Sequence, residues 1–271
     1  MKNQWKKSKN RQENATKPTR GRGSGQEFWN KEYKGAGKRS PQQKAHLALS
    51  NTPSGDLVKF TRWLEREYGR LYLNPLASAV DLGCGNGRNL IYLSENFGLR
   101  GIGFDISREA ILQAKSLSGG PGSKQRLPLE YHVDSIAHSP TDPFPVEDGS
   151  QTFVLDMTAS HFLKREERKA LRAEISRMLK PGGWLFFKTF LLDEDLNAER
   201  LLRDHPAEES GSYIHPQIGV SEHVFTEKEI IQDFEESGQF TIHKITKSHR
   251  HLENGRAGKR RSLSVYVQKM L

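Results

Sequence analysis

Short apolar runs that lead into a carboxylate stand out along the chain. Residues 79–82 are apolar apart from Asp81, and residues 101–104 run directly into Asp105. A Gly-x-Gly-x-Gly segment and a helix-like repeat separate these two runs. Strand, glycine turn, helix and second strand in this order predict an open α/β sheet. They also predict a nucleoside-binding crevice at the carboxyl ends of its strands.

Periodicity and turn residues predict further elements in the first two thirds of the chain. Ser54 suits a helix N-cap, and four apolar residues follow it at helical spacing: Leu57, Phe60, Leu64 and Tyr68. This helix is expected to pack on the sheet near the glycine segment. Residues 129–134 and 152–157 are predicted to form a third and a fourth strand, and a fifth strand opens after the turn at Gly182-Gly183.

The C-terminal region alternates apolar and polar residues in two segments, 240–245 and 262–267. This pattern predicts two half-buried strands, and Asn254-Gly255 between them suits a hairpin turn. Basic residues gather before the second strand, at Lys259 to Arg261. They either protect an exposed sheet edge by their charge or hold an anionic substrate at the rim of the active site.

The glycine segment narrows the choice of cofactor. Gly83 and Gly85 let the chain reverse direction through positive φ values, and they let backbone N–H groups approach a ligand closely. A dinucleotide fingerprint requires Gly-x-Gly-x-x-Gly, and its last position, residue 88, is arginine here. This departure weighs against NAD and FAD as ligands.

The segment Asp81-x-Gly83-x-Gly85-x-Gly87 resembles the first motif of the class I S-adenosylmethionine-dependent methyltransferases. Later motifs stand in the order of that family, since Asp105 ends the second strand and Asp134 and Ser135 follow the third. The resemblance covers residues 75–190 well and the two ends of the chain loosely.

This resemblance implies a Rossmann-like three-layer α/β/α sandwich, with a mostly parallel seven-stranded sheet and a C-terminal antiparallel hairpin. It implies S-adenosylmethionine as the cofactor, with Asp105 accepting hydrogen bonds from both ribose hydroxyls and Asp134 with Ser135 beside the adenine. The cofactor-binding residues that it implies are Asp81, Gly83, Cys84, Gly85, Gly87, Asp105, Ile106, Asp134, Ser135 and Asp156.

The net charge of +9 is concentrated in the N-terminal residues. Residues 1–44 hold 13 Lys and Arg against 3 Asp and Glu, a net charge of +10, which leaves −1 for the rest. Residues 1–27 have almost no apolar side chains and are predicted to be a disordered basic tail. Such a tail either binds nucleic acid through counterion release or only improves solubility.

Residues 28–74 are predicted to form a helical segment that covers the active site, followed by a methyltransferase domain at 75–271. The aromatic segment from Phe28 to Tyr33 resembles the N-terminal segment that folds over the cofactor in small-molecule methyltransferases. The alternative is that Trp29 and Tyr33 only fasten the chain to the core.

Composition also bears on location. The chain has no run of 18 apolar residues, so no membrane span is expected, and residues 1–10 lack the apolar segment of a signal peptide. The single cysteine, Cys84, excludes internal disulfides and fits a reducing compartment. A cytoplasmic enzyme is therefore expected, with an oligomeric state that the sequence leaves open.

The acceptor side of the site is expected in residues 191–225, a long insertion after the fifth strand. Candidates for substrate contact or proton transfer are His215 and His223 in this insertion, and His161 just after the fourth strand. The alternative for each of them is a purely structural role. No metal site is predicted, because His205, His215 and His223 lack the close spacing of a ligand set.

Absent motifs limit the reaction. The fourth strand leads into Asp156-Met157-Thr158-Ala159 in place of the Asn/Asp-Pro-Pro-aromatic motif of amide and adenine-N6 methylation. The single cysteine, Cys84, lies inside the glycine turn and is not expected to attack a pyrimidine. In-line methyl transfer to an O, N or S nucleophile remains, with a small-molecule acceptor favoured because the insertion must supply specificity. The alternatives are an RNA or protein methyltransferase that uses residues 1–44, and a non-catalytic nucleic-acid-binding protein on the same fold.

Overall fold

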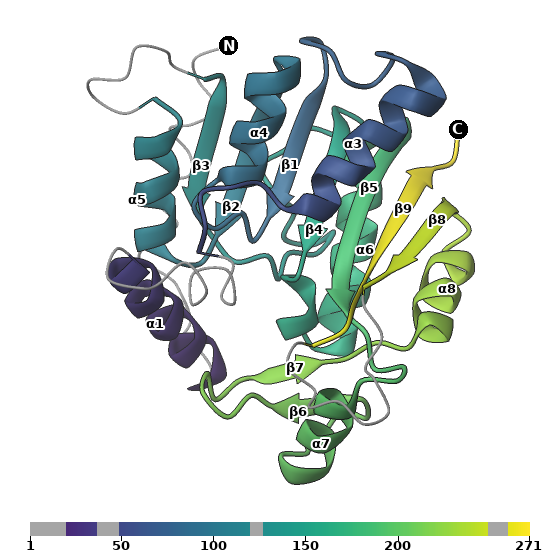
Figure 1. Ribbon diagram of the computed structural model, residues 1–271. Helices are drawn as coiled ribbons and strands as arrows, with labels where there is room; N and C mark the ends of the chain where they lie inside the picture. The colour runs from purple at the N-terminus through teal and green to yellow at the C-terminus, as the bar shows by residue number, and fades with distance from the viewer. Residues whose placement is uncertain (1–19, 37–48, 120–126, 249–259) are drawn as a thin grey trace.

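The computed structural model describes residues 20–36, 49–119, 127–248 and 260–271 (Figure 1). Its centre is a seven-stranded sheet in the order β3-β2-β1-β4-β5-β9-β8, in which all neighbours are parallel except the two pairs made by β9. The strands are β1 Ser78–Leu82, β2 Arg100–Asp105, β3 Leu129–Val133, β4 Gln151–Met157, β5 Leu179–Phe190, β8 Phe240–Lys247 and β9 Ser262–Lys269. The predicted α/β fold, with its antiparallel C-terminal pair, is confirmed.

Helices cover both faces of this sheet. One face packs against α3 Gly55–Tyr68, α4 Arg88–Phe97 and α5 Arg108–Leu117, and the other against α6 Arg165–Met178 and α8 Glu227–Glu236. Successive residues of the central strands point to opposite faces, so Val80 belongs to the cluster under α6 and α8 while Ala79 belongs to the cluster under α3, α4 and α5. The result is the three-layer α/β/α sandwich.

Strand β9 departs from the predicted half-buried pattern. Residues 263–267 are all buried, because β9 lies between β5 and β8 and is covered on both faces. The edge position belongs to β8 instead, where Phe240 alone is buried. The predicted turn at Asn254-Gly255 lies outside the described residues.

Helix α3 packs on the sheet as part of the sandwich, as expected for the helix that begins after Ser54. Phe60 of α3 packs against aromatic rings on the sheet, namely Phe153, Trp184, Phe186 and Tyr266. Ser54 takes the N-cap position, but its side chain makes no capping bond. Its backbone N–H donates instead to Oδ1 of Asn89 in α4, at 3.0 Å.

Helix α1, Arg20–Gly35, lies against α5 at the carboxyl edge of the sheet (Figure 1). It begins inside the range 1–27 that is predicted to be disordered, so the predicted boundary is wrong for residues 20–27. The physical reason is that Trp29 and Tyr33 pack against the domain and hold the helix in place. Residues 1–19 lie outside the described residues, and their disorder stays a prediction.

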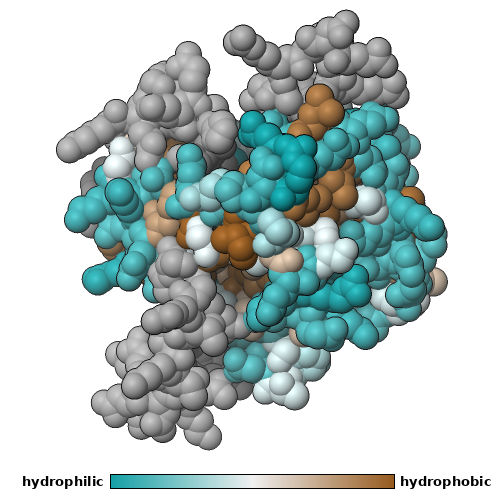
Figure 2. Space-filling view, turned by 90° about the horizontal axis from the view of Figure 1, so that it is seen from below, coloured by the Kyte–Doolittle hydropathy of each residue, from teal (hydrophilic) through white to brown (hydrophobic). Residues whose placement is uncertain are grey.

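The insertion after β5 lies across the carboxyl ends of the parallel strands, on the same side of the sheet as α1 (Figure 1). It contains α7 Leu196–Asp204 and a small sheet of β6 Ser212–Ile214 and β7 Ser221–His223. Figure 2 views this side from below and shows apolar residues at its centre, between hydrophilic ones. Open α/β sheets bind their ligands at this edge.

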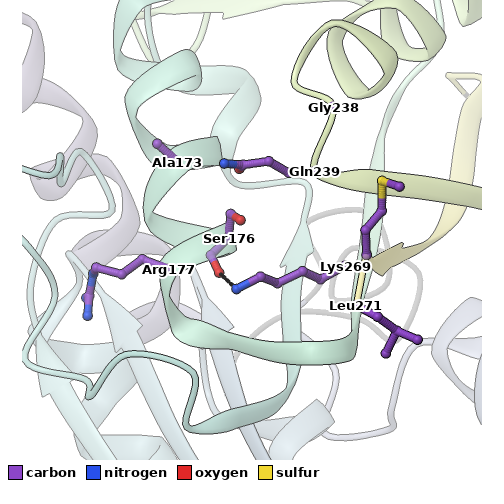
Figure 3. Close-up of a pocket in the computed structure, with 8 residues that line it drawn as sticks. Ala173, Ser176, Arg177, Gly238, Gln239, Lys269 and Leu271 are labelled. Carbon is purple, nitrogen blue, oxygen red and sulfur yellow. Dashed lines mark hydrogen bonds between the residues drawn. The ribbon is translucent and has the colours of Figure 1, made fainter.

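A surface cavity of about 430 Å³ lies at the opposite edge, between α6, the turn after α8 and the end of β9 (Figure 3). The ammonium group of Lys269 in this cavity donates to the carbonyl oxygens of Ser176 and Leu179, at 2.7 and 2.9 Å. Its charge therefore caps the end of α6. Within the described ranges, no helix combines the length and the apolar character that crossing a bilayer requires.

Candidate cofactor and acceptor site

The loop between β1 and α4 is built from three glycines with positive φ. Gly83, Gly85 and Gly87 have φ values of 72°, 57° and 75°. A Cβ at Gly85 would overlap the hydroxyl of Tyr33, and one at Gly87 would lie 2.5 Å from the hydroxyl of Tyr131. Both conformation and space therefore require glycine here.

Asp105, at the end of β2, joins this loop to the next one. The backbone N–H of Gly85 donates to Asp105 Oδ2 at 2.9 Å, and the N–H of Ser107 donates to Oδ1 at 2.8 Å. Burial raises the pKa of Asp105 to about 6, although these two hydrogen bonds act in the opposite direction. Two backbone hydrogen bonds thus fix the orientation of this carboxylate beside the glycine loop, and it ionises just below neutral pH.

Asp81, at the end of β1, is a buried carboxyl group with an unused acceptor. Within the described residues, its Oδ2 atom has no hydrogen-bond partner. Burial raises the pKa of Asp81 to about 8, while the guanidinium of Arg88 acts to lower it. A buried acid without a partner is costly, and a cationic group of a ligand at the glycine loop would remove this cost.

Helix α1 closes the site from the side of β2. Gln26 donates through Nε2 to the carbonyl oxygen of Ile106 at 2.9 Å. Asn30 Oδ1 accepts a hydrogen bond from the hydroxyl of Ser107 at 2.9 Å. Tyr33 lies beside Gly85, where burial first and the nearby Asp105 second raise the pKa of its phenol. The aromatic segment is thus both fastened to the core and in contact with the glycine loop.

The remaining predicted cofactor residues fall into two groups. Asp134 follows β3 beside Asp105: its N–H donates to the carbonyl oxygen of Asp105 at 3.0 Å, and its Oδ1 accepts from the N–H of Ser135. Asp156 serves the structure differently, because its buried Oδ1 accepts the N–H of Ser160 at 3.1 Å. The structure therefore gathers the predicted residues at the ends of β1, β2 and β3 and uses Asp156 to shape the loop after β4.

Of the three predicted histidines, His161 alone lies in the loop after β4. It belongs to the short 3-10 helix η4, Ser160–Phe162, and its ring packs against Phe162 and Phe190. Within the described part of the chain, neither ring nitrogen has a hydrogen-bond partner, and Nε2 is 4.0 Å from Glu222 Oε2. Burial lowers the pKa of His161 to about 4, so the ring is neutral at neutral pH.

The other two histidines hold the insertion together. Both ring nitrogens of His223 are occupied at 2.8 Å, Nδ1 by the hydroxyl of Ser212 and Nε2 by the carboxylate of Glu229. His215 accepts two backbone N–H groups of the following turn at Nδ1. No group of three potential metal ligands occurs in the described ranges.

Arg260 and Arg261, which directly precede β9, do not protect an exposed sheet edge, the first of the two roles predicted for the basic cluster. Arg261 is buried, its backbone N–H donates to Asp195 Oδ2 at 2.6 Å, and its guanidinium donates to Glu194 at 2.7 Å. Arg260 pairs with Glu222 of β7. Both arginines therefore fasten the insertion to the sheet, an outcome that sequence spacing does not reveal, and Lys259 lies outside the described residues.

The fold and the glycine loop define a nucleoside-binding protein of the Rossmann-like class. Residues 80–187 match the family model described as "Methyltransferase domain". A solved structure of an S-adenosylmethionine-dependent methyltransferase from Methanosarcina mazei is 27% identical, with a TM-score of 0.59, and covers 74% of this chain and 95% of that chain. These matches identify residues 80–187 as a methyltransferase domain similar to those of S-adenosylmethionine-dependent enzymes.

Curated relatives are more distant. A glycine/sarcosine/dimethylglycine N-methyltransferase of Actinopolyspora halophila is 24% identical over 143 residues, which are 52% of this chain and 24% of the relative. The O-methyltransferase resE of Aspergillus sclerotiorum is also 24% identical, over 59% of each chain. The chain thus matches between about a quarter and three fifths of the length of these relatives.

The residues at the glycine loop fit the cofactor of this family, S-adenosylmethionine. The cofactor carries an ammonium group, a ribose and an adenine, and the loop offers a partnerless buried carboxyl in Asp81 and a second carboxylate in Asp105. Both lie where the glycines bring the backbone within reach of a ligand.

Proposed function

We propose that this protein transfers the methyl group of S-adenosylmethionine to an O, N or S atom of a small molecule. The observation that carries this proposal is the buried, partnerless Oδ2 of Asp81 beside the three-glycine loop. The elevated pKa of Asp81 means that burial destabilises its ionised form, and a bound cation would stabilise this form.

The cofactor-holding residues then have separate tasks. Asp81 pairs with the ammonium group of the cofactor, and Asp105 accepts the hydrogen bonds of the ribose hydroxyls. Asp134 and Ser135 lie beside the adenine. Bound S-adenosylmethionine supplies a methyl group on a positively charged sulfur, from which a nucleophile takes it in line.

The acceptor is proposed to be a small molecule bound between the loop after β4 and the insertion. In support, the insertion lies over the carboxyl edge of the sheet, and the names of the curated relatives describe methylation of glycine derivatives in one case and O-methylation in the other. His161 is the proposed acceptor-side residue, because its neutral, buried ring keeps nitrogen atoms that can hydrogen-bond to the acceptor. His215 and His223 are less suited, since Nδ1 of His215 and both ring nitrogens of His223 already have hydrogen-bond partners in the insertion or in α8.

Calorimetric titration of the full chain with S-adenosylmethionine, S-adenosylhomocysteine and NAD tests the cofactor. We expect both sulfur compounds to bind and NAD not to bind; preference for NAD, or no binding at all, would overturn the proposal. Incubating the enzyme and methyl-labelled cofactor with a fractionated small-molecule extract then tests the acceptor, and label appearing only in macromolecules would contradict it.

The basic N-terminal segment supports a second candidate, an RNA or protein methyltransferase. Residues 1–44 carry a net charge of +10, which suits binding to a polyanion. Deleting residues 1–19 leaves α1 intact and isolates this effect. RNA binding that weakens with salt and disappears on deletion would favour this candidate, and absence of RNA binding would exclude it for RNA.

A further inference from the structure

Four buried nitrogen atoms without hydrogen-bond partners gather beside the loop after β4. Two are the ring nitrogens of His161, and two are Nε and Nη2 of Arg260. All four are shielded from solvent, and none has a partner in the described part of the chain. Unpaired buried donors are rare in folded proteins, and those of a guanidinium are the most costly.

The same aromatic ring and the same carboxylate bring these atoms together. The guanidinium carbon of Arg260 lies 3.8 Å from the centroid of the Phe190 ring, and the ring of His161 is 5.3 Å from that centroid. Glu222 faces both groups, through Oε1 toward Arg260 and through Oε2 toward His161. The cluster therefore joins β5, β7, β9 and η4.

The cluster is also connected to the glycine loop. Ala159 begins the turn that carries His161, and a Cβ added to Gly83 would lie 2.6 Å from the Cβ of Ala159. Phe162, on the other side of His161, contacts Trp29 of α1, with ring centroids 6.4 Å apart. The partnerless nitrogens thus lie one short turn away from the proposed methyl donor.

The structural contacts of Arg260 use only one side of its guanidinium. Nη1 donates to the hydroxyl of Tyr213 at 2.7 Å and to Glu222, and this suffices to fasten the insertion. Nε and Nη2 form the other edge, which presents two parallel N–H groups and matches the two oxygens of a carboxylate. A clamp alone does not explain why this edge is buried and left without acceptors.

We propose that the Nε and Nη2 edge of Arg260 binds a carboxylate of the methyl acceptor, next to His161. This proposal rests on the proposed methyltransferase function and narrows its substrate to small carboxylic acids. Glu222 and Tyr213 hold the guanidinium through Nη1, so that the free edge keeps its orientation. The neutral ring of His161 then lies beside the bound acid as a further hydrogen-bonding partner.

The test uses the full chain saturated with S-adenosylhomocysteine, which prevents turnover. The probes are benzoate and hexanoate at millimolar concentration, each compared with its neutral amide. We expect at least one acid to raise the unfolding temperature and to shift the Arg260 Nε–H resonance, with neither effect from the amides. Acids without effect, or amides equal to acids, would overturn the proposal.

Variants separate recognition from folding. Arg260→Gln should weaken acid binding about tenfold or more while binding of S-adenosylhomocysteine is unchanged. Because Arg260→Gln leaves Glu222 without its partner, the pair Arg260→Gln with Glu222→Gln is measured as well. Arg203→Gln, an exposed arginine of α7, is the control and should respond as the wild type. If the paired variant still binds the acid, Arg260 does not bind the carboxylate. If the wild type does not bind S-adenosylhomocysteine, the proposed function itself is refuted.

Discussion

Replacing Asp105 by asparagine tests the link between the glycine loop and the cofactor. The carboxylate accepts one backbone N–H at each oxygen, from Gly85 and from Ser107. Asparagine keeps the shape but has a single acceptor oxygen, so one N–H group loses its partner at a cost of about 1–3 kcal/mol. The remaining bonds also lose the assistance of the charge, and we expect affinity for S-adenosylhomocysteine to fall about 10- to 100-fold.

The pH dependence of the wild type gives an independent measure. With a pKa of about 6, Asp105 is about nine-tenths ionised at pH ~7 and about one-tenth ionised at pH ~5. The ionisation of Asp105 should therefore lower affinity about tenfold between these pH values if the ionised form binds the cofactor. In Asp105→Asn this contribution should be absent, and only the contribution of Asp81, whose pKa of about 8 lies above this range, should remain.

Stability of the free protein should change in the opposite direction. Because the pKa of Asp105 in the folded protein is raised above the ordinary value of 3.8, its contribution to stability is fully present below 3.8 and is lost as pH rises through about 6. The difference corresponds to about 3 kcal/mol, and Asp105→Asn should remove this dependence.

Calorimetry with S-adenosylhomocysteine and chemical denaturation, both across this pH range, measure the two effects. Asp204→Asn, on the surface of α7, is the control for charge removal. An asparagine variant with the affinity and pH profile of the wild type would refute the assignment of Asp105 to the cofactor.

Three further predictions follow from the described contacts. Asp81→Asn should weaken binding of S-adenosylhomocysteine at least about tenfold in calorimetry. Methylthioadenosine lacks the ammonium group, so its binding should be unchanged. Equal losses for both ligands would contradict the role of Asp81. Gly87→Ala should lower the free energy of unfolding by about 3 kcal/mol, measured with denaturant, because the added Cβ would collide with the buried Tyr131. Gly149→Ala is the control: it has positive φ but open space, and should lower the free energy of unfolding by only about 1 kcal/mol. Equal losses would count against the steric argument. Glu222→Ala should lower the free energy of unfolding by about 3–5 kcal/mol, because the Arg260 guanidinium loses its carboxylate, and a loss below about 1 kcal/mol would show that the pair is not a clamp.

Local patterns in the sequence were sufficient to predict the elements that carry the proposed cofactor site. The glycines, the carboxylates that end β1 and β2 and the apolar runs between them act over a few residues, so their consequence is visible in the chain itself. Asp105 reaches Gly85 only because a short helix returns the chain to the neighbouring strand. Such a unit has essentially one right-handed solution.

The acceptor side depends on contacts between distant residues, and the sequence pattern did not encode them. Arg260 pairs with Glu222 across 38 positions, and Arg261 binds Asp195 across 66. Basic residues before a strand suggest an exposed edge, yet here Arg261 is buried and Arg260 is half-buried against the insertion. The histidines posed the same difficulty, because spacing does not show that the ring of His223 lies between Ser212 of the insertion and Glu229 of α8.

The position of β9 between β5 and β8 has a consequence for synthesis on the ribosome. Strand β8 is made before β9, which is its partner among the described strands. Residues 240–247 therefore emerge with both edges unpaired and wait until residues 262–269 have left the exit tunnel. During this interval the exposed edge of β5 and both edges of β8 are open to incorrect pairing.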